Sequence, residues 1–279
     1  MTNAAGHTKP EGANSQNDDA ALADASRNAL FVGSVEKAFA VLSAFKGAKA
    51  PLSLSQIATA TGMGKSAAQR FCYTLVALGL LDRDESTRRM RPGVRLLELS
   101  KSYLMSDPLT TVANPYLLRA RDACGQAMNL GIPLGQDIIY ISRMRSAQSH
   151  IVNPIVGGRA PLFCTSSGRA YLSTLDQSDV EQILDTSDLS PLTRHTITDR
   201  SEILERIDQA RADGFAMASQ ECIIGELTVG APILGADQTA LGAINICVSL
   251  PSWSLERVRA ELAPLVTQTA HEITLGLSN

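Results

Sequence analysis

The feature that most constrains the fold of this chain is the spacing of small and apolar residues within residues 54–84. Ala58, Gly62, Ala68 and Phe71 follow one another at intervals that allow two short helices to cross at a tight turn. Ala58 permits close approach of the second helix, and Gly62 supplies a turn residue with positive φ. Ala68 and Phe71 bury the second helix against the first. The stretch therefore predicts a helix-turn-helix.

The second helix of this motif carries one polar stripe at helical spacing. All of its members can bond phosphates or base edges in a DNA major groove, and they are Lys65, Ser66, Gln69, Arg70 and Tyr73. Gln69 and Arg70 are the best base readers because both can donate two hydrogen bonds to a purine edge, whereas Lys65 is expected on a phosphate. Ser55, in the first helix, is a further predicted DNA contact. The alternative is an ordinary solvated helix face.

A further helix is expected before this pair. Ser34 can cap a helix whose apolar stripe comprises Val35, Ala38, Phe39, Leu42 and Phe45. Ser53, with Gln56 three residues later, predicts a capping box for the next helix. The predicted recognition helix covers residues 65–78 and stops at Gly79, a usual C-terminal signal.

Two short strands are expected after the recognition helix, at residues 80–83 and 89–91. They flank a turn, and the arginines there are well placed for backbone phosphates or the minor groove: Arg88, Arg89 and Arg91. For Arg91, an ion pair within the hairpin is an equal alternative. Three helices and this hairpin together predict a winged helix-turn-helix.

Charge is distributed unevenly along the 279 residues. Residues 31–92 contain nine Lys or Arg and four Asp or Glu, whereas residues 93–279 contain fourteen and twenty. A basic first domain joined to an acidic second one is typical of a nucleic-acid reader coupled to a module that does not bind DNA. Chance clustering of solvated charge is the alternative. Residues 1–30 have almost no large apolar side chain, which predicts a disordered tail.

Several classes of protein are disfavoured by composition and motifs. No apolar run approaches the ~18 residues of a membrane span, and no secretory signal opens the chain. Five widely spaced cysteines without a CxxC pair suit reduced thiols in a cytoplasm and argue against a metal site. The histidines are scattered, and neither a Gly-x-Ser-x-Gly elbow nor a nucleotide-binding glycine loop is found. We therefore expect a cytoplasmic protein without cofactor, metal or membrane contact that is not an enzyme.

Helices and strands alternate in the rest of the chain. A linker helix near residues 94–105, with apolar side chains suited to packing against a second copy, is followed by a break at Ser106-Asp107-Pro108. Helices are then predicted at 116–128, 168–175, 178–184, 201–213 and 255–277, and strands at 137–143, 150–156, 227–233 and 240–248. The last two strands flank a turn at 235–237 and should form a hairpin. The second domain is therefore predicted to be α+β, with an antiparallel sheet flanked by helices.

Six segments in the two domains have a recognisable order and spacing. They are SVEKAFAVLSAF at 34–45, LSLSQIATATGMGKSAAQRF at 52–71, TLVALGLLDRD at 74–84, VGGRAPLFCTSSGRAYLS at 156–173, TITDRSEILERIDQARADGFA at 196–216 and GAPILGADQTALGAINICVS at 230–249. Together they resemble the IclR family of bacterial transcriptional regulators. The segments RFCYTL and CTSSGR look more like the branch that governs aromatic-acid catabolism than like the glyoxylate-bypass branch.

This resemblance implies a pocket for a small effector in a GAF-like second domain. Matching the family's pocket places backbone N–H donors for an anionic ligand at Ser166 and Ser167, because a helix N-terminus favours negative charge. Capping of that helix by the same serines is the competing role. The full set of effector-binding candidates, from the resemblance and from residue chemistry, is Arg159, Cys164, Ser166, Ser167, Thr228, Asn245 and Cys247. For each of the two cysteines, the favoured alternative is a small buried residue without contact to a ligand.

Three positions depart from the family pattern. Ala218 stands where the glyoxylate-binding members have an acidic residue, which argues against a tiny polar oxoacid and leaves room for a larger ligand. Gly64 replaces the proline that commonly opens the recognition helix, and Arg88 replaces the glycine of the wing turn. The last two changes bear on the operator sequence and on the wing geometry.

The sequence thus predicts an α+β protein with four parts. They are a disordered tail (1–30), a winged helix-turn-helix (31–93), a linker helix (94–110) and a GAF-like domain for effector binding and oligomerisation (111–279). The expected function is regulation of transcription through double-stranded operator DNA, by a homodimer or tetramer that responds to a small organic acid. Repression and activation both fit. The alternatives are an effector-independent repressor whose second domain only assembles oligomers, and an enzyme built on a GAF-like domain.

Overall fold

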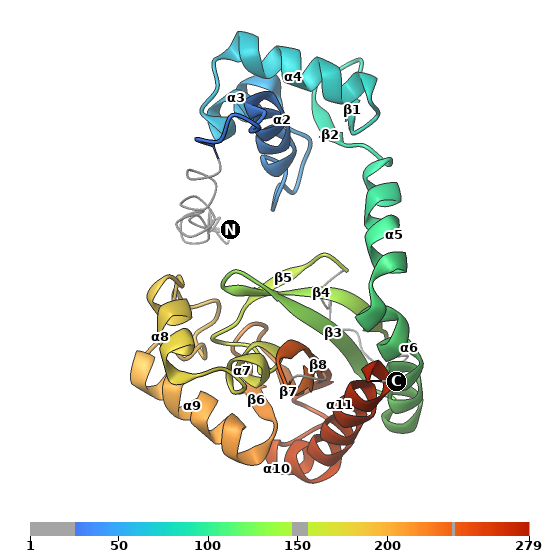
Figure 1. Ribbon diagram of the computed structural model, residues 1–279, viewed down its shortest axis with the longest axis vertical. Helices are drawn as coiled ribbons and strands as arrows, with labels where there is room; N and C mark the ends of the chain where they lie inside the picture. Colours follow the sequence, from blue (N-terminus) through green and yellow to red (C-terminus); the bar gives the residue numbers. More distant parts are fainter. Residues whose placement is uncertain (1–25, 147–155, 236–237, 279) are drawn as a thin grey trace, which may run out of the picture. The chain divides into compact units, whose positions relative to one another are not determined.

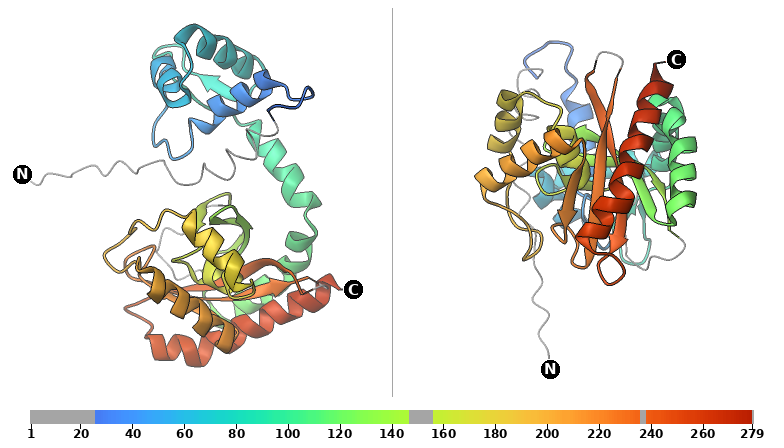
Figure 2. Two further views of the ribbon diagram at one scale, coloured as in Figure 1. Left: turned by 60° about the vertical axis from the view of Figure 1, so that its left-hand side comes forward. Right: turned by 90° about the horizontal axis from the view of Figure 1, so that it is seen from below.

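The computed structural model describes residues 26–146, 156–235 and 238–278. Internal contacts divide the chain into two compact units, with the boundary between Ser106 and Asp107. Figure 1 and Figure 2 show a mostly helical first unit and a second unit built on a sheet. Most of the predicted tail, and residues 150–155 of one predicted strand, lie outside the described residues.

The first unit is a winged helix-turn-helix followed by one further helix. Its elements are α2 (Gly33–Ser43), α3 (Leu54–Thr61), α4 (Lys65–Ala77), β1 (Leu81–Arg83), β2 (Met90–Pro92) and α5 (Leu96–Ser106). One apolar cluster joins the three helices to the hairpin, and its buried members are Val41, Phe45, Ile57, Cys72, Leu75, Leu81 and Met90. The predicted fold of this unit is therefore confirmed.

Local signals that the sequence offered are visible around α3. Ser53 and Gln56 form the predicted capping box, in which the Ser53 hydroxyl accepts from the Gln56 N–H and the Gln56 side chain accepts from the Ser53 N–H. Gly62 ends the helix with a φ of +66°, and Gly79 follows α4 with a φ of +72°. Ala68 is fully buried where the helices cross. The turn that sets the angle between α3 and α4 is thus determined locally.

The prediction for the preceding helix was wrong in two details. Val35 and Phe39, placed in the apolar stripe, are exposed. The residues that pack in the core are Val41, which was not predicted, and Ala38, Leu42 and Phe45 of the predicted stripe, the last of them just after α2. Ser34 does not cap the helix, which begins at Gly33 without a side-chain cap. Both sets of residues have helical spacing, so periodicity alone could not decide which apolar face the helix turns toward the core.

The second unit contains a six-stranded antiparallel sheet in the order β5-β4-β3-β8-β7-β6. The strands are β3 (Ala127–Leu134), β4 (Asp137–Met144), β5 (Arg159–Pro161), β6 (Ala216–Ser219), β7 (Glu226–Leu234) and β8 (Ala240–Ser249). The predicted hairpin of the last two is confirmed by their pairing. Strands β3, β5 and β6 were not predicted. Strand β3 lies where a helix end was expected and contains Gly131 and Pro133, which weaken a strand pattern.

Helices cover both faces of this sheet. On one face, α6 (Pro108–Cys124) and α11 (Ala263–Leu277) pack together against β3, β7 and β8. On the other face, α7 (Ser166–Leu172) packs against β7 and β8, and α8 (Gln177–Asp185) and α9 (Arg200–Asp213) complete an apolar cluster with it. Gly230 makes this approach possible, because a Cβ atom there would lie 3.0 Å from the Ser166 carbonyl carbon.

Two predicted helices, those that correspond to α6 and α7, have clearly different bounds in the structure. Helix α6 begins at Pro108 rather than after Pro115, because the Asp107 carboxylate caps it by accepting from the Thr110 N–H at 2.7 Å. It ends at Gly125, so the prediction of helix through residue 128 was wrong. Helix α7 runs from 166 to 172 instead of 168 to 175. The long C-terminal helix is continuous over 255–277, with a π-helical segment η1 (Val258–Leu262) before Pro264, which lacks an N–H donor.

Candidate functional site

The first candidate site is the exposed face of α4. Lys65, Ser66, Gln69, Arg70 and Tyr73 all project from it into solvent, and Tyr73 has an exposed fraction of 75%. The opposite face of the helix carries the buried Ala68, Cys72 and Leu75. The predicted polar stripe is therefore brought together on one surface, and Ser55 is exposed on the first turn of α3.

The three arginines predicted in the hairpin of β1 and β2 are exposed and have different partners. Arg91 pairs with Asp82 across the strands at 3.4 Å, the ion pair considered as an alternative to DNA contact. Arg88 lies 3.3 Å from Glu85. Arg89 instead donates to the Pro51 carbonyl at 3.0 Å and to Gln56 Oε1 at 3.3 Å, so it ties the wing to the start of α3.

The wing turn is organised by a carboxylate. Asp84 accepts hydrogen bonds from the hydroxyls and N–H groups of Ser86 and Thr87, and these bonds, led by that of the Ser86 hydroxyl, lower the pKa of Asp84 to about 2. Arg88, which replaces the expected glycine, adopts the left-handed conformation with a φ of +57°. The wing therefore keeps a tight turn without the glycine.

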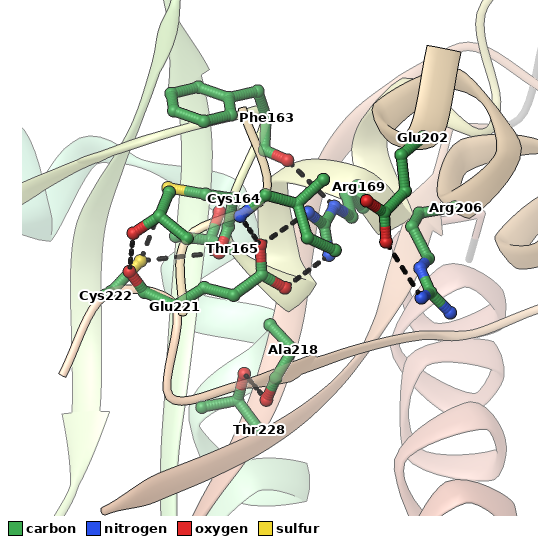
Figure 3. Close-up of polar contacts among 12 residues, drawn as sticks. Phe163, Cys164, Thr165, Arg169, Glu202, Arg206, Ala218, Glu221, Cys222 and Thr228 are labelled. Carbon is green, nitrogen blue, oxygen red and sulfur yellow. Dashed lines mark hydrogen bonds and ion pairs between the residues drawn. The ribbon is translucent and has the colours of Figure 1, made fainter. Parts of the chain in front are cut away.

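The second candidate site is a cavity of about 420 Å³ within the second unit. It lies between the loop that precedes α7, the segment between β6 and β7, and the face of the sheet that turns toward α7 (Figure 3). Six of the seven predicted effector residues line it: Arg159, Cys164, Ser166, Thr228, Asn245 and Cys247. Ser167 is fully buried in the first turn of α7 and is not among the lining residues.

The cap of α7 is neither of the two predicted serines. Thr165 precedes the helix, and its hydroxyl oxygen accepts from the Gly168 N–H at 3.0 Å. Capping by Ser166 or Ser167 was therefore the wrong alternative. Because α7 has only seven residues, its dipole would stabilise a bound anion only weakly. A hydrogen bond from the Ser166 hydroxyl is therefore the more important contact for an anionic ligand.

Strand register gathers polar side chains on the floor of the cavity. Asn129 on β3 lies opposite Asn245 on β8, and Cys247 lies opposite Thr228 on β7. Asn129 donates to Asn245 Oδ1 at 3.2 Å and to Cys247 Sγ at 3.3 Å. Two buried atoms of the lining residues, Asn129 Oδ1 and Ser166 Oγ, have no hydrogen-bond partner within the described protein. Such atoms favour a ligand that can complete their hydrogen bonding.

Two ionisable side chains at the cavity, Glu226 and Arg159, have their charge reduced or compensated in different ways. Burial raises the pKa of Glu226 to about 7, although a hydrogen bond involving Cys247 and the charge of Arg143 act in the opposite direction. Arg159 is paired with Asp137 at 3.0 Å and donates to the Leu134 carbonyl at 2.9 Å. Its positive charge is therefore shared with a protein carboxylate.

One wall of the cavity is held by a buried ion pair. The guanidinium of Arg169 on α7 makes two hydrogen bonds of 2.7 Å to the carboxylate of Glu221 and a third, of 2.8 Å, to the Phe163 carbonyl (Figure 3). Thr196 donates to the Glu221 carbonyl at 2.6 Å. This anchor fixes the segment from Gln220, whose φ is +59°, to Glu226 against the cavity.

Sequence reasoning missed five lining residues of chemical interest: Asn129, Tyr140, Glu221, Cys222 and Glu226. Glu226 directly precedes a predicted strand, and Asn129 lies in a segment interpreted as helix and loop. For Glu226, the available sequence signal was a polar residue next to an apolar strand segment, which is only weak evidence for a cavity residue.

Two other kinds of site lack support among the described residues. Within the described part of the chain, no helix combines the length and the apolar composition that crossing a bilayer requires. In those same residues, no three His, Cys, Asp or Glu side chains gather so that they could hold a metal ion.

Comparison with known proteins identifies the family of both units. Residues 34–85 match the IclR helix-turn-helix domain, and residues 101–275 match the C-terminal domain of the bacterial transcriptional regulator IclR. The chain is 32% identical over 244 residues to the Pca regulon regulatory protein of Pseudomonas putida, covering 87% of this chain and 83% of that protein.

Solved structures show the same fold. A transcriptional regulator of Rhodococcus sp. RHA1 is 33% identical, with a TM-score of 0.77 over 89% of this chain and 99% of that one. An IclR homologue of Microbacterium hydrocarbonoxydans, solved in complex with 4-hydroxybenzoate, is 21% identical, with a TM-score of 0.74 over 88% and 98% of the two chains. This chain therefore belongs to the IclR family of bacterial transcriptional regulators and is a DNA-binding regulator rather than an enzyme.

Proposed function

We propose that a small organic acid with a second polar group, such as a hydroxylated aromatic acid, binds in the cavity and changes the affinity of the regulator for its operator. The observation that carries this proposal is the pair of buried, unpartnered atoms on the cavity lining, Ser166 Oγ and Asn129 Oδ1. Leaving such atoms unsatisfied costs roughly 1–3 kcal/mol each, so a ligand that bonds both is favoured.

The chemistry of these two atoms defines the ligand. The Ser166 hydroxyl can donate to a carboxylate, and Asn129 Oδ1 can only accept, which suits a ligand hydroxyl. A volume of about 420 Å³ is in the range of small-molecule sites, and Ala218 contributes a small apolar side chain to the lining. The regulator of the Pca regulon and the homologue with bound 4-hydroxybenzoate support the aromatic class.

In the first unit, we assign DNA recognition to the exposed face of α4. Gln69 and Arg70 read base edges, and Lys65 contacts a phosphate, with Ser55, Ser66 and Tyr73 beside them. The wing arginines contact the backbone or the minor groove. Arg89 has a second role, because its bonds to Pro51 and Gln56 orient the wing relative to α3.

Regulation requires that the ligand bind two states of the protein with different affinity. Helix α5 has no buried residue and exposes Leu97, Leu99, Tyr103 and Met105, which fits packing against a second copy. We infer that residues 31–93, 94–110 and 111–279 act as DNA-binding domain, linker and effector domain of a dimer or tetramer in the cytoplasm. Ligand binding would then alter the spacing of paired recognition helices.

A gel shift on the DNA upstream of the gene tests DNA recognition and its response together. The regulator should shift this fragment, and 4-hydroxybenzoate or a related acid should change the apparent affinity. Arg70→Ala should lose about 1–3 kcal/mol of specific affinity and relax the sequence preference at one base pair. An unchanged footprint for Arg70→Ala would remove this residue from the reading face.

Titration calorimetry with a panel of aromatic and aliphatic acids tests the cavity. Ser166→Ala should weaken binding of the best acid, whereas Ser173→Ala should not. Ser173 is the buried C-cap residue of the same helix, and it donates to the Ala170 carbonyl and does not line the cavity. Equal loss in both variants would point to damage of α7 instead. If the wild type binds no acid of the panel, the competing function is favoured: a repressor whose second unit serves only for assembly.

A further inference from the structure

Two cysteines from distant parts of the chain meet at the wall of the cavity. Cys164 precedes α7, and Cys222 follows 58 residues later, between β6 and β7. Their sulfur atoms are 3.5 Å apart, and the Cys222 thiol donates to the Cys164 carbonyl at 3.4 Å (Figure 3). Among the described residues, no other two cysteine sulfurs make such a contact.

The surrounding polar contacts hold the two thiols in this position. Arg169 bonds the carbonyl of Phe163, the neighbour of Cys164, and the carboxylate of Glu221, the neighbour of Cys222. One buried guanidinium therefore fixes both backbone segments that carry the thiols. This arrangement differs from a chance approach of two mobile side chains. The Cys222 segment cannot move away without breaking the buried ion pair, and the Cys164 segment cannot do so without losing the hydrogen bond to the Phe163 carbonyl.

The two thiols are not equally accessible. Cys164 is fully buried, and its hydrogen bond to Cys222 together with burial raises the pKa of its thiol. Cys222 is only partly buried, and both cysteines line the cavity. A small oxidant that enters the cavity therefore meets Cys222 first, and Cys164 lies behind it as the second thiol.

We propose that Cys164 and Cys222 are a reversible oxidation site for a small hydroperoxide. The Cys222 sulfur, after losing its proton, attacks one peroxide oxygen; the O–O bond breaks, and an alcohol, or water from hydrogen peroxide, leaves with a proton. The resulting sulfenic acid is attacked by the Cys164 sulfur, which gives up its proton as the S–O bond breaks and water leaves. Two thiols and one hydroperoxide thus yield a disulfide, an alcohol and water.

Formation of this bond requires the sulfurs to approach from 3.5 Å to about 2.05 Å, which tightens the wall of the cavity. The segment carrying Cys222 would be fastened to the loop before α7, and Cys222 would be drawn toward Cys164. This consequence for the ligand rests on the proposed effector function. We expect that the oxidised protein binds the acid more weakly than the reduced protein.

Peptide mapping of the full-length protein tests the disulfide itself. After treatment with hydrogen peroxide and alkylation of free thiols, trypsin releases residues 160–169, and cleavage after glutamate at 221 and 226 separates Cys222 from Cys247. We expect one linked pair, 160–169 with 222–226, that disappears after reduction by dithiothreitol. Cys124→Ser, which changes another partly buried cysteine, should give the same linked pair.

The other outcomes contradict the site. A linked pair that contains Cys247, or irreversible oxidation of Cys222 without a link, would overturn the proposal. So would loss of the 160–169 thiol in Cys222→Ser at the wild-type rate, because Cys164 should react only through Cys222. Alkylation of the reduced, folded wild type tests the order of reaction without a variant. Cys222 should be modified before Cys164, and the reverse order would contradict the proposal.

Calorimetry with 4-hydroxybenzoate as the probe separates this inference from the proposed function. Peroxide treatment should weaken binding of 4-hydroxybenzoate to the wild type, and dithiothreitol should restore it. The same treatment should leave the affinity of Cys222→Ser unchanged. If the linked peptide forms and the reduced protein binds no acid of the panel, the effector function fails and the oxidation site stands. If the acid binds and no linked peptide forms, the reverse holds.

Discussion

The buried carboxyl of Glu226 makes the stability of the second unit depend on pH. Its pKa is raised from 4.5 to about 7 because burial at the edge of the cavity disfavours the charged form. The folded protein therefore holds this proton more tightly than the unfolded chain does. Its stabilising effect is complete below about pH 4.5 and is lost as the pH rises through about 7. At ~1.4 kcal/mol per pKa unit, the total loss is about 3 kcal/mol.

Urea unfolding followed by tryptophan fluorescence measures this effect in the correct part of the protein. Trp253 is the single tryptophan of the chain, and it lies between β8 and α10 (Leu255–Arg257) with the Arg257 guanidinium 3.9 Å from its ring centroid. Glu226→Gln keeps the size of the side chain and removes the titration. From about pH 5 to about pH 8, the variant should gain roughly 3 kcal/mol of unfolding free energy relative to the wild type.

When the variant and the wild type are compared at each pH, the contributions of the histidines and carboxylates that both contain cancel in the difference of unfolding free energy. Glu205→Gln on the exposed side of α9 is the matched control, because it makes the same chemical change away from the cavity. A Glu226→Gln difference that stays constant with pH would show that Glu226 remains charged in the fold. A difference of the opposite sign would show that Arg143, rather than burial, controls this carboxyl.

Three further predictions concern single contacts. Glu221→Gln leaves the buried Arg169 without a carboxylate and should cost ~3–5 kcal/mol in the same urea assay, where a loss below ~1 kcal/mol would contradict a dry ion pair. Gly168→Ala places a Cβ 2.3 Å from a backbone oxygen and should destabilise the unit by ~1–3 kcal/mol, whereas Gly64→Ala meets nothing within 4 Å and should unfold like the wild type. Arg89→Ala should weaken binding to all DNA sequences alike and lower the salt dependence by about one ion, and a sequence-selective effect in filter binding would refute a backbone role.

The elements of the first unit could be predicted because their signals are local. The Ser53–Gln56 capping box and the glycines at 62 and 79 each act within one helical turn, and the structure contains all three. The face of α2 was not predictable in the same way. Val35 and Phe39 are as apolar as Val41, and only packing against α3 and α4 decides which of them is buried.

The second unit was predicted less completely because its strands depend on partners far away in the chain. β3 pairs with β8 across more than 100 residues, and its own sequence, AMNLGIPL, contains an Asn, a Gly and a Pro that are poor strand formers. Six of the seven predicted effector residues do line the cavity, and four of these six came from the resemblance to a family. Those it did not supply, Glu226 and Cys222 among them, are brought to the cavity by β7 and by the Arg169 anchor.

Strand register explains why the cavity is polar although the sheet is largely apolar. Residues directly opposite on antiparallel strands share a face, so the pairs Asn129–Asn245 and Thr228–Cys247 place all four polar side chains toward α7. A slip of one residue in either pairing would exchange them for Ile246 and Val229, which lie on the face covered by α11, and would bury polar groups in an apolar layer. The same pairings that stabilise the sheet therefore also determine which side chains a ligand meets.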